Sequence, residues 1–400
     1  MLNSGRVKVL LCHNYYQQRG GEDESIEDEG ALLQSFGHEV VWYTRDNADI
    51  DKLSRWQLAR ASLWNRQTYD DVRALIARER PEIVHCTNTV PLISPSVYDA
   101  AHDEGVAVVQ GLRNYRFVCP GGLLLRDGQV CEACLHKRIA WPAVVHGCYR
   151  DSRTFSAGLT ATVAMQRARN GWTGNVDMYF APSEFTRGKY VEAGLPADRI
   201  GVSPHWIHPD PGPGSGAGGY VVFVGRLSRE KGVETLLEAW KTVPPSARLV
   251  VVGEGPLEKA VTRAAAADSR IEWVGRKTHA EVLQVIGDAA CLVLPSITYE
   301  TFGRTIAEAF SRGTPAVVSG SGAMAELVDD GRTGYHARPG DAADLAGKIS
   351  RLLALPAAER ARMRAAARAE YLRRFTAAPN YELLLAIYRR ALDFRRARAA

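Results

Sequence analysis

The sequence predicts an α/β protein built from two doubly wound domains, and three observations support this. Short apolar runs rich in Val and Ile recur along the chain, most without strict polar alternation, as is typical of parallel strands buried on both faces. Helix-length amphipathic segments separate these runs, which is the order expected of βαβ units. The chain has 400 residues, too many for one compact core and a comfortable length for two domains.

The apolar runs predict strands in both halves of the chain. In order they are VKVLLC, HEVVWYT, EIVHC, VAVVQ, MYFAPS and IGVSP, then YVVFVGR, ARLVVVG, IEWVG, CLVLPS and PAVVSG. The amphipathic segments predict helices over Glu22–Phe36, Thr68–Arg80, Ser94–Glu104, Ser183–Ala193, Val233–Val243, Pro256–Ala267, His279–Asp288 and Thr305–Arg312. From about residue 341 the pattern is purely helical, with one interruption at 375–380.

Residues 208–219, HPDPGPGSGAGG, hold five Gly and three Pro and predict a linker, because such a stretch continues neither a helix nor a central strand. The linker separates a first domain, residues 1–207, from a second domain, residues 220–379. Two Rossmann-like halves joined in this way would face each other across a cleft. Strand carboxyl ends and helix amino ends would then converge on a ligand there.

Composition and charge exclude several protein classes. Hydrophobic residues make up 46% and charged residues 24%, which argues against a disordered chain, and no run of eighteen apolar residues predicts a membrane span. The net charge of +5 is concentrated at the end: residues 351–400 carry twelve Arg and four acids, so residues 1–350 sum to −3. This distribution argues against nucleic acid as a partner. The opening residues lack a signal-peptide pattern, so we expect a cytoplasmic protein.

Two cations follow the strand YVVFV, in the segment GRLSREKG. Arg226 lies at the end of the strand, and Lys231 lies five residues later, before a helix that starts near Gly232. This placement suits a diphosphate, although a solvated surface loop is the alternative. A weaker signal of the same kind is the pair Gly20 and Gly21 before the first long helix. The free backbone N–H groups of such a helix start bind anions, but a glycine pair is equally typical of a flexible turn.

Two carboxylates lie in the segment YETFGRTIAEAF, after the strand CLVLPS. Glu300 is in the loop, Gly303 is at the expected helix start, and Glu308 is about one turn into the helix. Carboxylates accept hydrogen bonds from sugar or ribose hydroxyls, and N–H groups at a helix start bind anions. A capping acid and a surface glutamate would explain each residue separately, but the combination favours a ligand site.

These segments, together with VVGEGP and ELVDDGRTGY, closely resemble glycosyltransferase family 4, whose members are retaining enzymes of the GT-B fold. The resemblance covers nearly the whole chain, and the spacing E-x7-E between Glu300 and Glu308 matches the signature of the family. It implies a sugar transferred from a nucleotide-diphosphate sugar to an acceptor hydroxyl, in the biosynthesis of a glycan, a polysaccharide or a glycosylated natural product. It also implies a C-terminal helix, at about 380–400, that crosses back to the first domain.

The resemblance also implies roles for individual residues. Arg226 and Lys231 would hold the diphosphate without a catalytic metal, Glu300 would contact the donor sugar, and Glu308 would contact the ribose. The remaining donor-site residues would be the backbone of Phe302, Gly303 and Arg304 beside the phosphates, Gly20 and Gly21 as the opposite lip, Arg276 and Lys277 beside the base, and Glu254 and Gly255 in the same pocket.

One residue departs from the family pattern. Arg113, in GLRNYR, occupies the place where the family commonly has a histidine. An arginine donates to a sugar hydroxyl or a phosphate but does not act as a base, so we expect Arg113 in the catalytic site and a strong loss of turnover on its replacement by Ala. His13 and His85 are alternatives for the missing histidine, although ordinary strand-end roles are favoured for both.

Four of the seven cysteines cluster within the segment 119–148, with the spacing C-x11-C-x2-C-x13-C. Cys119, Cys131, Cys134 and Cys148 predict a structural zinc site, because four thiolates leave no open position for catalysis. Reduced pairs, or a disulfide formed on oxidation, are the alternatives. Some family 4 enzymes resemble this insertion, so the resemblance extends to a subgroup with a Cys-rich N-terminal domain.

Three other functions remain as alternatives. The first is a nucleotide-sugar epimerase, which would not explain the E-x7-E pair with Arg226 and Lys231. The second is a zinc-dependent nucleic-acid binder, which conflicts with the net negative charge of residues 1–350. The third is an inactive nucleotide-sugar-binding homologue, which the replacement of the family histidine by Arg113 leaves open. The nucleotide, the sugar and the acceptor are not readable from the sequence. The surplus arginines of the tail, Arg389, Arg390, Arg395, Arg396 and Arg398, suit anionic headgroups at the cytoplasmic membrane face, with a solvated helix as the alternative.

Overall fold

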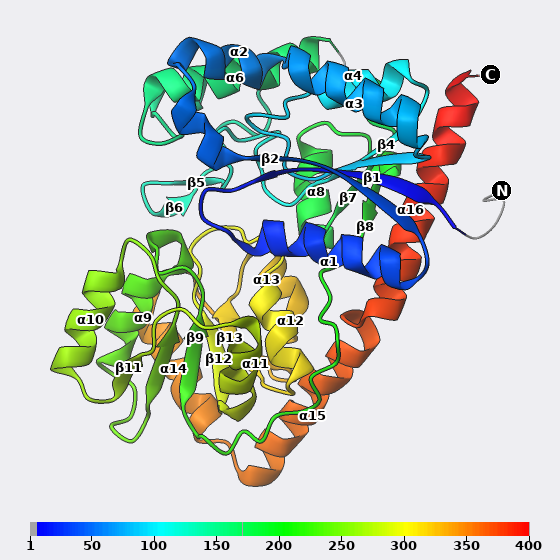
Figure 1. The fold of residues 1–400 in the computed structure, drawn as a ribbon. Coiled ribbons are helices and arrows are strands. Elements are labelled where there is room, and N and C mark those ends of the chain that lie inside the picture. Colours follow the sequence, from blue (N-terminus) through cyan, green and yellow to red (C-terminus); the bar gives the residue numbers. More distant parts are fainter. Residues whose placement is uncertain (1–5, 170, 400) are drawn as a thin grey trace. The chain divides into compact units, whose positions relative to one another are not determined.

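The computed structural model describes residues 6–169 and 171–399, apart from the side chains of Arg55 and Ala399. The chain forms two compact units. Unit 1 comprises the chain up to Leu124, Cys131–Ser203 and the chain from Tyr381 on, and unit 2 comprises Leu125–Val130 and Pro204–Asn380. Each unit holds one parallel sheet with helices on both faces (Figure 1). The predicted pair of Rossmann-like, doubly wound domains is therefore confirmed.

Unit 1 is built on a six-stranded parallel sheet in the order β2-β1-β3-β4-β7-β8. The strands are β1 (Lys8–Tyr15), β2 (Glu39–Asp46), β3 (Ile83–Cys86), β4 (Ala107–Gly111), β7 (Met178–Ala181) and β8 (Ile200–Val202). The helices are α1 (Gly21–Ser35), α2 (Arg55–Leu63), α3 (Arg66–Glu79), α4 (Ser96–Asp103), α5 (Trp141–Val145), α6 (Arg153–Ala168), α7 (Gly171–Asn175), α8 (Glu184–Glu192) and α16 (Ala377–Ala399). All six predicted strand runs of the first half form strands of this sheet.

Unit 2 is built on a second six-stranded parallel sheet, in the order β11-β10-β9-β12-β13-β14. The strands are β9 (Val221–Val224), β10 (Leu249–Val252), β11 (Ile271–Trp273), β12 (Cys291–Leu294), β13 (Ala316–Ser319) and β14 (Gly334–Ala337). The helices are α9 (Val233–Trp240), α10 (Glu258–Ala267), α11 (His279–Asp288), α12 (Arg304–Ser311), α13 (Gly322–Leu327), α14 (Ala342–Leu353) and α15 (Ala357–Arg374). Counted from β9, the strand order is 3-2-1-4-5-6, which places the topological switch point of the sheet between β9 and β12.

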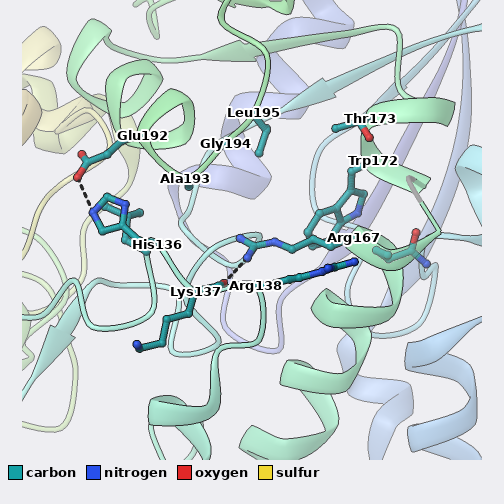
Figure 2. A pocket seen from close by; sticks show the side chains of 12 residues that line it. His136, Lys137, Arg138, Arg167, Trp172, Thr173, Glu192, Ala193, Gly194 and Leu195 are labelled. Atoms are coloured by element: carbon teal, nitrogen blue, oxygen red, sulfur yellow. Dashed lines mark hydrogen bonds and ion pairs between the residues drawn. The ribbon is translucent and has the colours of Figure 1, made fainter.

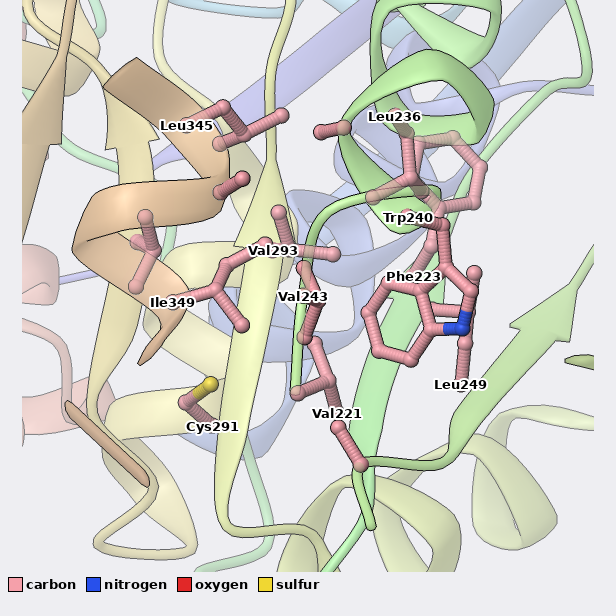
Figure 3. Close-up of a cluster of buried hydrophobic side chains, with 14 of the residues drawn as sticks. Val221, Phe223, Leu236, Trp240, Val243, Leu249, Cys291, Val293, Leu345 and Ile349 are labelled. Atoms are coloured by element: carbon pink, nitrogen blue, oxygen red, sulfur yellow. The ribbon is translucent and has the colours of Figure 1, made fainter. Parts of the chain in front are cut away.

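A dense apolar core holds one face of the unit 2 sheet against its helices (Figure 3). Phe223 of β9 and Val293 of β12 are fully buried, and Trp240 of α9 and Ile349 of α14 pack into the same cluster. Burial of a side chain of this size contributes about 1.5–3 kcal/mol. The carboxyl ends of β9 and β12, where the candidate ligand residues lie, therefore rest on a rigid base.

The observed boundary between the units lies slightly before the predicted one. Residues 204–207 cluster with unit 2, because the Ile207 amide donates to the Phe375 carbonyl at 2.9 Å and Tyr371 Oη donates to the Ile207 carbonyl at 2.9 Å. The predicted linker, 208–219, contains no helix or strand, yet it is bound to unit 2. The Gly214 amide donates to the Arg312 carbonyl at 2.8 Å, for example.

A second difference concerns the Cys-rich segment. The short strands β5 (Leu125–Arg126) and β6 (Gln129–Val130) pair with each other as an antiparallel hairpin and cluster with unit 2, although the prediction placed all of 119–148 in the first domain. The Cys131 amide donates to the Leu124 carbonyl at 2.8 Å. This hydrogen bond joins the two residues that flank the hairpin segment, and the remainder of the Cys-rich segment belongs to unit 1.

The last helix, α16, returns to unit 1 from Tyr381 on, as predicted. Tyr381 Oη lies 2.8 Å from His38 Nε2, and Tyr388 Oη lies 2.7 Å from His85 Nδ1. Gly201 of β8 gives the helix room, because a Cβ there would lie 2.8 Å from the Ile387 side chain. The helix is therefore an integral part of unit 1.

Several arginines of α16 bind unit 1 itself. Arg390, Arg395 and Arg398 donate to the backbone carbonyls of Asp198, His102 and Gly174. This leaves less of the surplus charge for a lipid surface than the sequence alone suggests, and membrane contact through the helix stays a prediction. None of the helices described by the structure is both long enough and apolar enough to span a bilayer.

Candidate functional site

The switch point of the unit 2 sheet brings together a lysine and a glutamate that are 69 residues apart in the sequence. Lys231 follows β9, Glu300 follows β12, and Lys231 Nζ donates to Glu300 Oε1 at 2.7 Å. Ligands of open α/β sheets bind outside the strand carboxyl ends at such a switch point. Both residues were predicted to bind the donor, and the structure places them in direct contact.

The surroundings of Glu300 keep its carboxylate ionised at neutral pH. Burial raises the pKa of this carboxyl, but the charge of Lys231 and hydrogen bonds from Lys231 and Ser296 outweigh it, so the net pKa lies below the usual value. Ser296 Oγ donates to Glu300 Oε1 at 2.7 Å. Sequence reasoning missed Ser296, although its position two residues after β12 is a signal for a residue at the carboxyl edge.

Gly232 makes the contact between Lys231 and Glu300 possible. Its φ is +71°, and a Cβ at this position would lie 1.9 Å from the Pro295 carbonyl oxygen at the end of β12. Any larger residue would push the two strand ends apart. The glycine therefore fixes the distance between the loop that carries Lys231 and the loop that carries Glu300.

The loops after β9 and β10 also pack backbone against backbone. The Gly253 φ is +130°, and a Cβ there would lie 2.0 Å from the Gly225 carbonyl oxygen. Gly255, with φ +156°, is equally close-packed, because its Cβ would lie 2.6 Å from the Leu227 carbonyl oxygen. These glycines leave a carboxyl edge lined by backbone atoms, which suits a ligand with phosphate oxygens.

Four of the predicted donor-site residues line this edge with less constraint. Arg226 is exposed, and no hydrogen bond or ion pair of its side chain is found in the described residues. Glu254 and Arg276 are exposed as well, in the loops after β10 and β11, and Lys277 Nζ lies 3.6 Å from Glu281 Oε1. The side chains of Arg226, Glu254 and Arg276 thus reach solvent, while that of Lys277 is paired with Glu281.

Helix α12 begins at the carboxyl edge of β12. Its N-cap residue, Gly303, has φ +91°, and the helix start presents the free N–H groups that favour anions. Glu308 is 6% exposed, and its Oε1 lies 3.4 Å from Arg304 Nε and 3.6 Å from His279 Nδ1. His279, at the start of α11, is a neighbour of Glu308 that the sequence did not indicate.

Phe302 has a structural role in addition to its predicted backbone role. Its side chain is 2% exposed and packs edge-on against His205 and Phe375, with ring centroids 4.9 and 5.7 Å away. The buried ring anchors the turn that precedes α12, which leaves the backbone of residues 302–304 at the edge.

In unit 1, Gly20 and Gly21 begin α1 at the carboxyl end of β1. A Cβ at either position would meet nothing within 4 Å, so packing within the protein does not require glycine there. The acids of the first turn bind the protein itself: Asp23 accepts from the Gly20 amide at 3.1 Å, and Glu22 accepts from Tyr16 Oη at 2.7 Å. The two glycines thus border open space, as a ligand-binding turn would.

Arg113 lies in the interior of unit 1. It is 7% exposed, its guanidinium pairs with the fully buried carboxylate of Glu29, and it stacks over the Phe180 ring at 5.2 Å. A buried charge needs such a partner. The contacts of Arg113 with Glu29 and Phe180 thus explain its burial without a substrate, whereas the sequence led us to expect a contact with sugar or phosphate.

The two histidines considered in place of the missing one are also interior. His13 Nε2 pairs with Asp23 Oδ1 at 2.7 Å. His85 is fully buried, with Nε2 3.4 Å from Glu29 Oε2, and burial followed by the charge of His13 lowers the pKa of His85 to about 3. His13 therefore pairs with Asp23, and His85 lies beside Glu29, the partner of Arg113.

The four clustered cysteines are present as thiols and lie in unit 1. Burial raises the pKa of the Cys134 thiol to about 11, and Cys148 packs against the same small buried cluster as Cys134. Within residues 6–169 and 171–399, however, no group of three or more His, Cys, Asp or Glu side chains is arranged to hold a metal ion. The zinc site stays a prediction.

Comparison with protein families gives the second half of the chain an assignment. A family model described as glycosyl transferases group 1 matches residues 215–370, which hold the Lys231–Glu300 pair and helix α12. Residues 215–370 are thus similar to the glycosyl transferases group 1 family. The predicted resemblance to glycosyltransferases is thereby confirmed, while the Cys-rich subgroup stays a prediction.

Among curated proteins, the glycogen synthase of Mycobacterium tuberculosis is 36% identical to this chain over 152 residues, which are 36% of this chain and 36% of that protein. The chain therefore matches only about a third of the length of this relative. The group 1 domain carries the similarity that the family model detects.

Solved structures support the fold of the whole chain. HepE of Anabaena, in complex with UDP and glucose, matches 95% of this chain and 98% of its own length with a TM-score of 0.69 and 17% identity. The sucrose-phosphate synthase of Thermosynechococcus elongatus matches 96% and 98% with a TM-score of 0.70 and 18% identity. At these identities the likeness establishes the fold, which is the predicted GT-B fold.

Proposed function

We propose that this protein transfers a sugar from a nucleotide-diphosphate sugar to an acceptor hydroxyl with retention of the anomeric configuration. The observation that carries the proposal is the contact between Lys231 and Glu300 at the switch point of a group 1 glycosyltransferase domain. A cation and a hydrogen-bond acceptor are thus held together where such a sheet receives its ligand.

In the proposed reaction, the bond between the anomeric carbon and the diphosphate oxygen breaks, and the acceptor oxygen bonds to that carbon on the same face. The acceptor proton passes to the leaving phosphate oxygen. Lys231 and the exposed Arg226 would neutralise the charge that develops on the diphosphate. Lys231 would then exchange part of its contact with Glu300 for the phosphate, which frees the Glu300 carboxylate to accept from a sugar hydroxyl.

The other donor-side roles follow the same proposal. Glu308 would accept from the ribose hydroxyls, and the backbone of residues 302–304 would donate to phosphate oxygens. Arg276 and Lys277 would flank the base beside Glu254 and Gly255.

UDP is the first nucleotide to test, because HepE of Anabaena was solved with UDP and glucose. GDP and ADP belong in the same screen. We propose a glycan, a polysaccharide precursor or a small natural product as the acceptor.

Thermal unfolding of the purified protein with each nucleoside diphosphate and its sugars tests the binding step. We expect one nucleotide to raise the midpoint of unfolding in a concentration-dependent way, because a ligand that binds the native state alone stabilises it. The Lys231→Ala variant should lose most of this shift. No shift with any nucleotide would contradict the proposal.

The stereochemical step has its own test. The anomeric configuration of the product, read from the proton coupling of its anomeric signal in NMR, should match that of the donor. Inversion would contradict the retaining mechanism, and interconversion of the donor without transfer would favour a nucleotide-sugar epimerase.

A further inference from the structure

Unit 1 contains a pocket that the proposed reaction does not use (Figure 2). Its volume is about 440 Å³, within the range of small-molecule sites. Four segments form its walls: the stretch after Cys134, the end of α6, helix α7, and the turn that follows α8. All four segments belong to unit 1.

Parts of the pocket wall lead into strands of the unit 1 sheet. Trp172 and Thr173 precede the start of β7, and the turn at 192–195 follows α8 and leads to the start of β8. Two walls therefore come from the amino ends of the strands. Gly20 and Gly21, in contrast, follow the carboxyl end of β1.

Positive charge dominates the lining. Lys137, Arg138 and Arg167 line the pocket, and none of them forms an ion pair with a carboxylate in the described part of the chain. The acid among the described lining residues is Glu192, and it is already engaged. Its carboxylate lies 2.9 Å from Lys189 Nζ and 3.1 Å from His136 Nε2.

Arg167 is the fixed element of this lining. Its Nη1 donates to the Lys137 carbonyl at 2.5 Å and its Nη2 donates to the Phe117 carbonyl at 3.4 Å, so the guanidinium is held in the pocket wall (Figure 2). Burial lowers the pKa of Arg167, as expected for a partly buried cation that is not neutralised by an anion. A guanidinium has five N–H donors, so the two carbonyls leave several donors for a ligand.

The remaining wall is apolar and rigid. Trp172 is 7% exposed and its ring packs against Phe117 with centroids 4.4 Å apart, while Leu135 and Leu195 are buried beside it. Such a surface packs against a carbon skeleton, and the cations around it bind oxyanions.

We propose that this pocket, which we call the Arg167 pocket, binds a small phosphorylated metabolite. The phosphate would contact Arg167, Lys137 and Arg138, and the carbon skeleton would rest on Trp172. The volume admits a small molecule, and the unneutralised cations provide charge complementarity. This inference does not depend on the proposed transfer reaction, because it rests on residues of unit 1 alone.

The test is a calorimetric titration of the full chain with inorganic pyrophosphate as the probe. It is carried out in the background Arg226→Ala/Lys231→Ala, so that the proposed diphosphate site does not contribute. We expect one equivalent of pyrophosphate to bind, with an affinity that falls as salt rises. Absence of binding at millimolar pyrophosphate would overturn the proposal.

Charge-reversed variants then locate the binding site. Lys137→Glu/Arg138→Glu should weaken pyrophosphate binding about tenfold or more, because two charge-assisted contacts are lost. Arg60→Glu, at an exposed position of α2 outside the pocket lining, is the control and should leave the affinity unchanged. Equal affinities in the two variants would overturn the proposal.

Arg167 is tested separately, because its replacement removes hydrogen bonds to two loop carbonyls. Arg167→Lys keeps the charge but lacks the planar fork. We expect weaker pyrophosphate binding at an unchanged urea unfolding midpoint for the Lys137→Glu/Arg138→Glu variant, and weaker binding with some loss of stability for Arg167→Lys. Wild-type affinity in Arg167→Lys would contradict the proposed contact.

Discussion

Arg113 illustrates at the residue scale how one side chain suits two different explanations. In the sequence it occupies the place where the resembling family commonly has a histidine, and this predicted a contact with the substrate. In the structure its guanidinium forms an ion pair with Glu29 and lies over the Phe180 ring. Sequence reasoning had no means to pair residues 84 positions apart.

We expect Arg113→Ala to destabilise the protein, because it leaves the Glu29 carboxylate buried without its ion pair. The free energy of unfolding in urea should fall by about 3–5 kcal/mol. The double variant Arg113→Met/Glu29→Gln should recover much of this loss, because both buried charges are removed together. Wild-type stability with a selective loss of turnover in Arg113→Ala would instead support the substrate contact predicted from the sequence.

His85 predicts a pH dependence of stability. Its pKa is lowered to about 3 in the folded protein from an ordinary value of 6.5, so the unfolded state binds more protons between these values. The contribution of His85 is therefore fully present above pH 6.5 and is lost as the pH falls toward 3. Glu29, His13 and Tyr388 face this histidine from the surrounding elements, and Glu29 pairs in turn with Arg113.

Urea unfolding at a series of pH values measures this effect. We expect the free energy of unfolding to fall more steeply below pH 6.5 in the wild type than in His85→Gln. His102→Gln, at a partly exposed position, serves as the control and should keep the wild-type slope. Equal slopes in the wild type and His85→Gln would contradict the assignment.

At the element scale, the loop between β9 and α9 depends on Gly232. Gly232→Ala adds a Cβ 1.9 Å from the Pro295 carbonyl oxygen at φ +71°, so the loop must move away from β12. We expect weaker binding of the nucleotide found in the thermal screen, by about tenfold or more, because a displaced Lys231 loses part of its charge-assisted contact. Isothermal calorimetry measures the affinity.

Gly219→Ala is the matched control for this change. Gly219 has nearly the same backbone conformation, with φ +68°, but its added Cβ would meet nothing within 4 Å. It therefore carries the strain of a positive φ without the clash. If both variants bind the nucleotide alike, the close approach at Pro295 does not position Lys231.

The Cys-rich segment is the element whose chemistry stays open. The spacing of its four cysteines predicts about one zinc ion per chain after purification under reducing conditions, measured by atomic emission. Replacement of Cys131 and Cys134 by Ser should abolish the metal and destabilise the segment, because two thiolate ligands are lost. Less than about a tenth of an equivalent of zinc in the wild-type protein would contradict the site.

The strands and helices of the structure can be compared with those predicted from the sequence. Every predicted strand run and helix segment corresponds to an element of the structure, because buried parallel strands and amphipathic helices have strong local patterns. Missed were β14, in which a glycine and a histidine weaken the apolar pattern, and the helices α2, α5, α6, α7 and α13. Of these helices, α5 lies in the Cys-rich segment. The sequence also gave no signal for the hairpin of β5 and β6.

At the scale of the whole molecule, the two-domain organisation was readable from the alternation of strands and helices, and the return of α16 to unit 1 from the family resemblance. The proposed donor-side residues Lys231 and Glu300 were readable as candidates as well, since each follows a strand that the sequence predicts. Their mutual contact was not, because it depends on which strands are neighbours at the switch point. The Arg167 pocket was invisible, because its walls come from four separate segments.

The structure also explains part of the net charge of +5. It is concentrated in the last fifty residues, and the structure uses three of the arginines of α16 to hold this helix on unit 1. The charge therefore contributes to the assembly of unit 1, whatever its role at a membrane.

The central claim is that Lys231 at the switch point of unit 2 promotes sugar transfer from a nucleotide donor. The most direct measurement is the rate at which nucleoside diphosphate is released from the nucleotide sugar that binds, in the wild type, Lys231→Ala and Arg229→Ala. Arg229 is an exposed arginine of the same loop, so its variant controls for the loss of a positive charge nearby. We expect Lys231→Ala to lower the rate about 10²–10³-fold and Arg229→Ala to leave it within about twofold; a Lys231→Ala variant that releases the diphosphate at the wild-type rate would contradict the account.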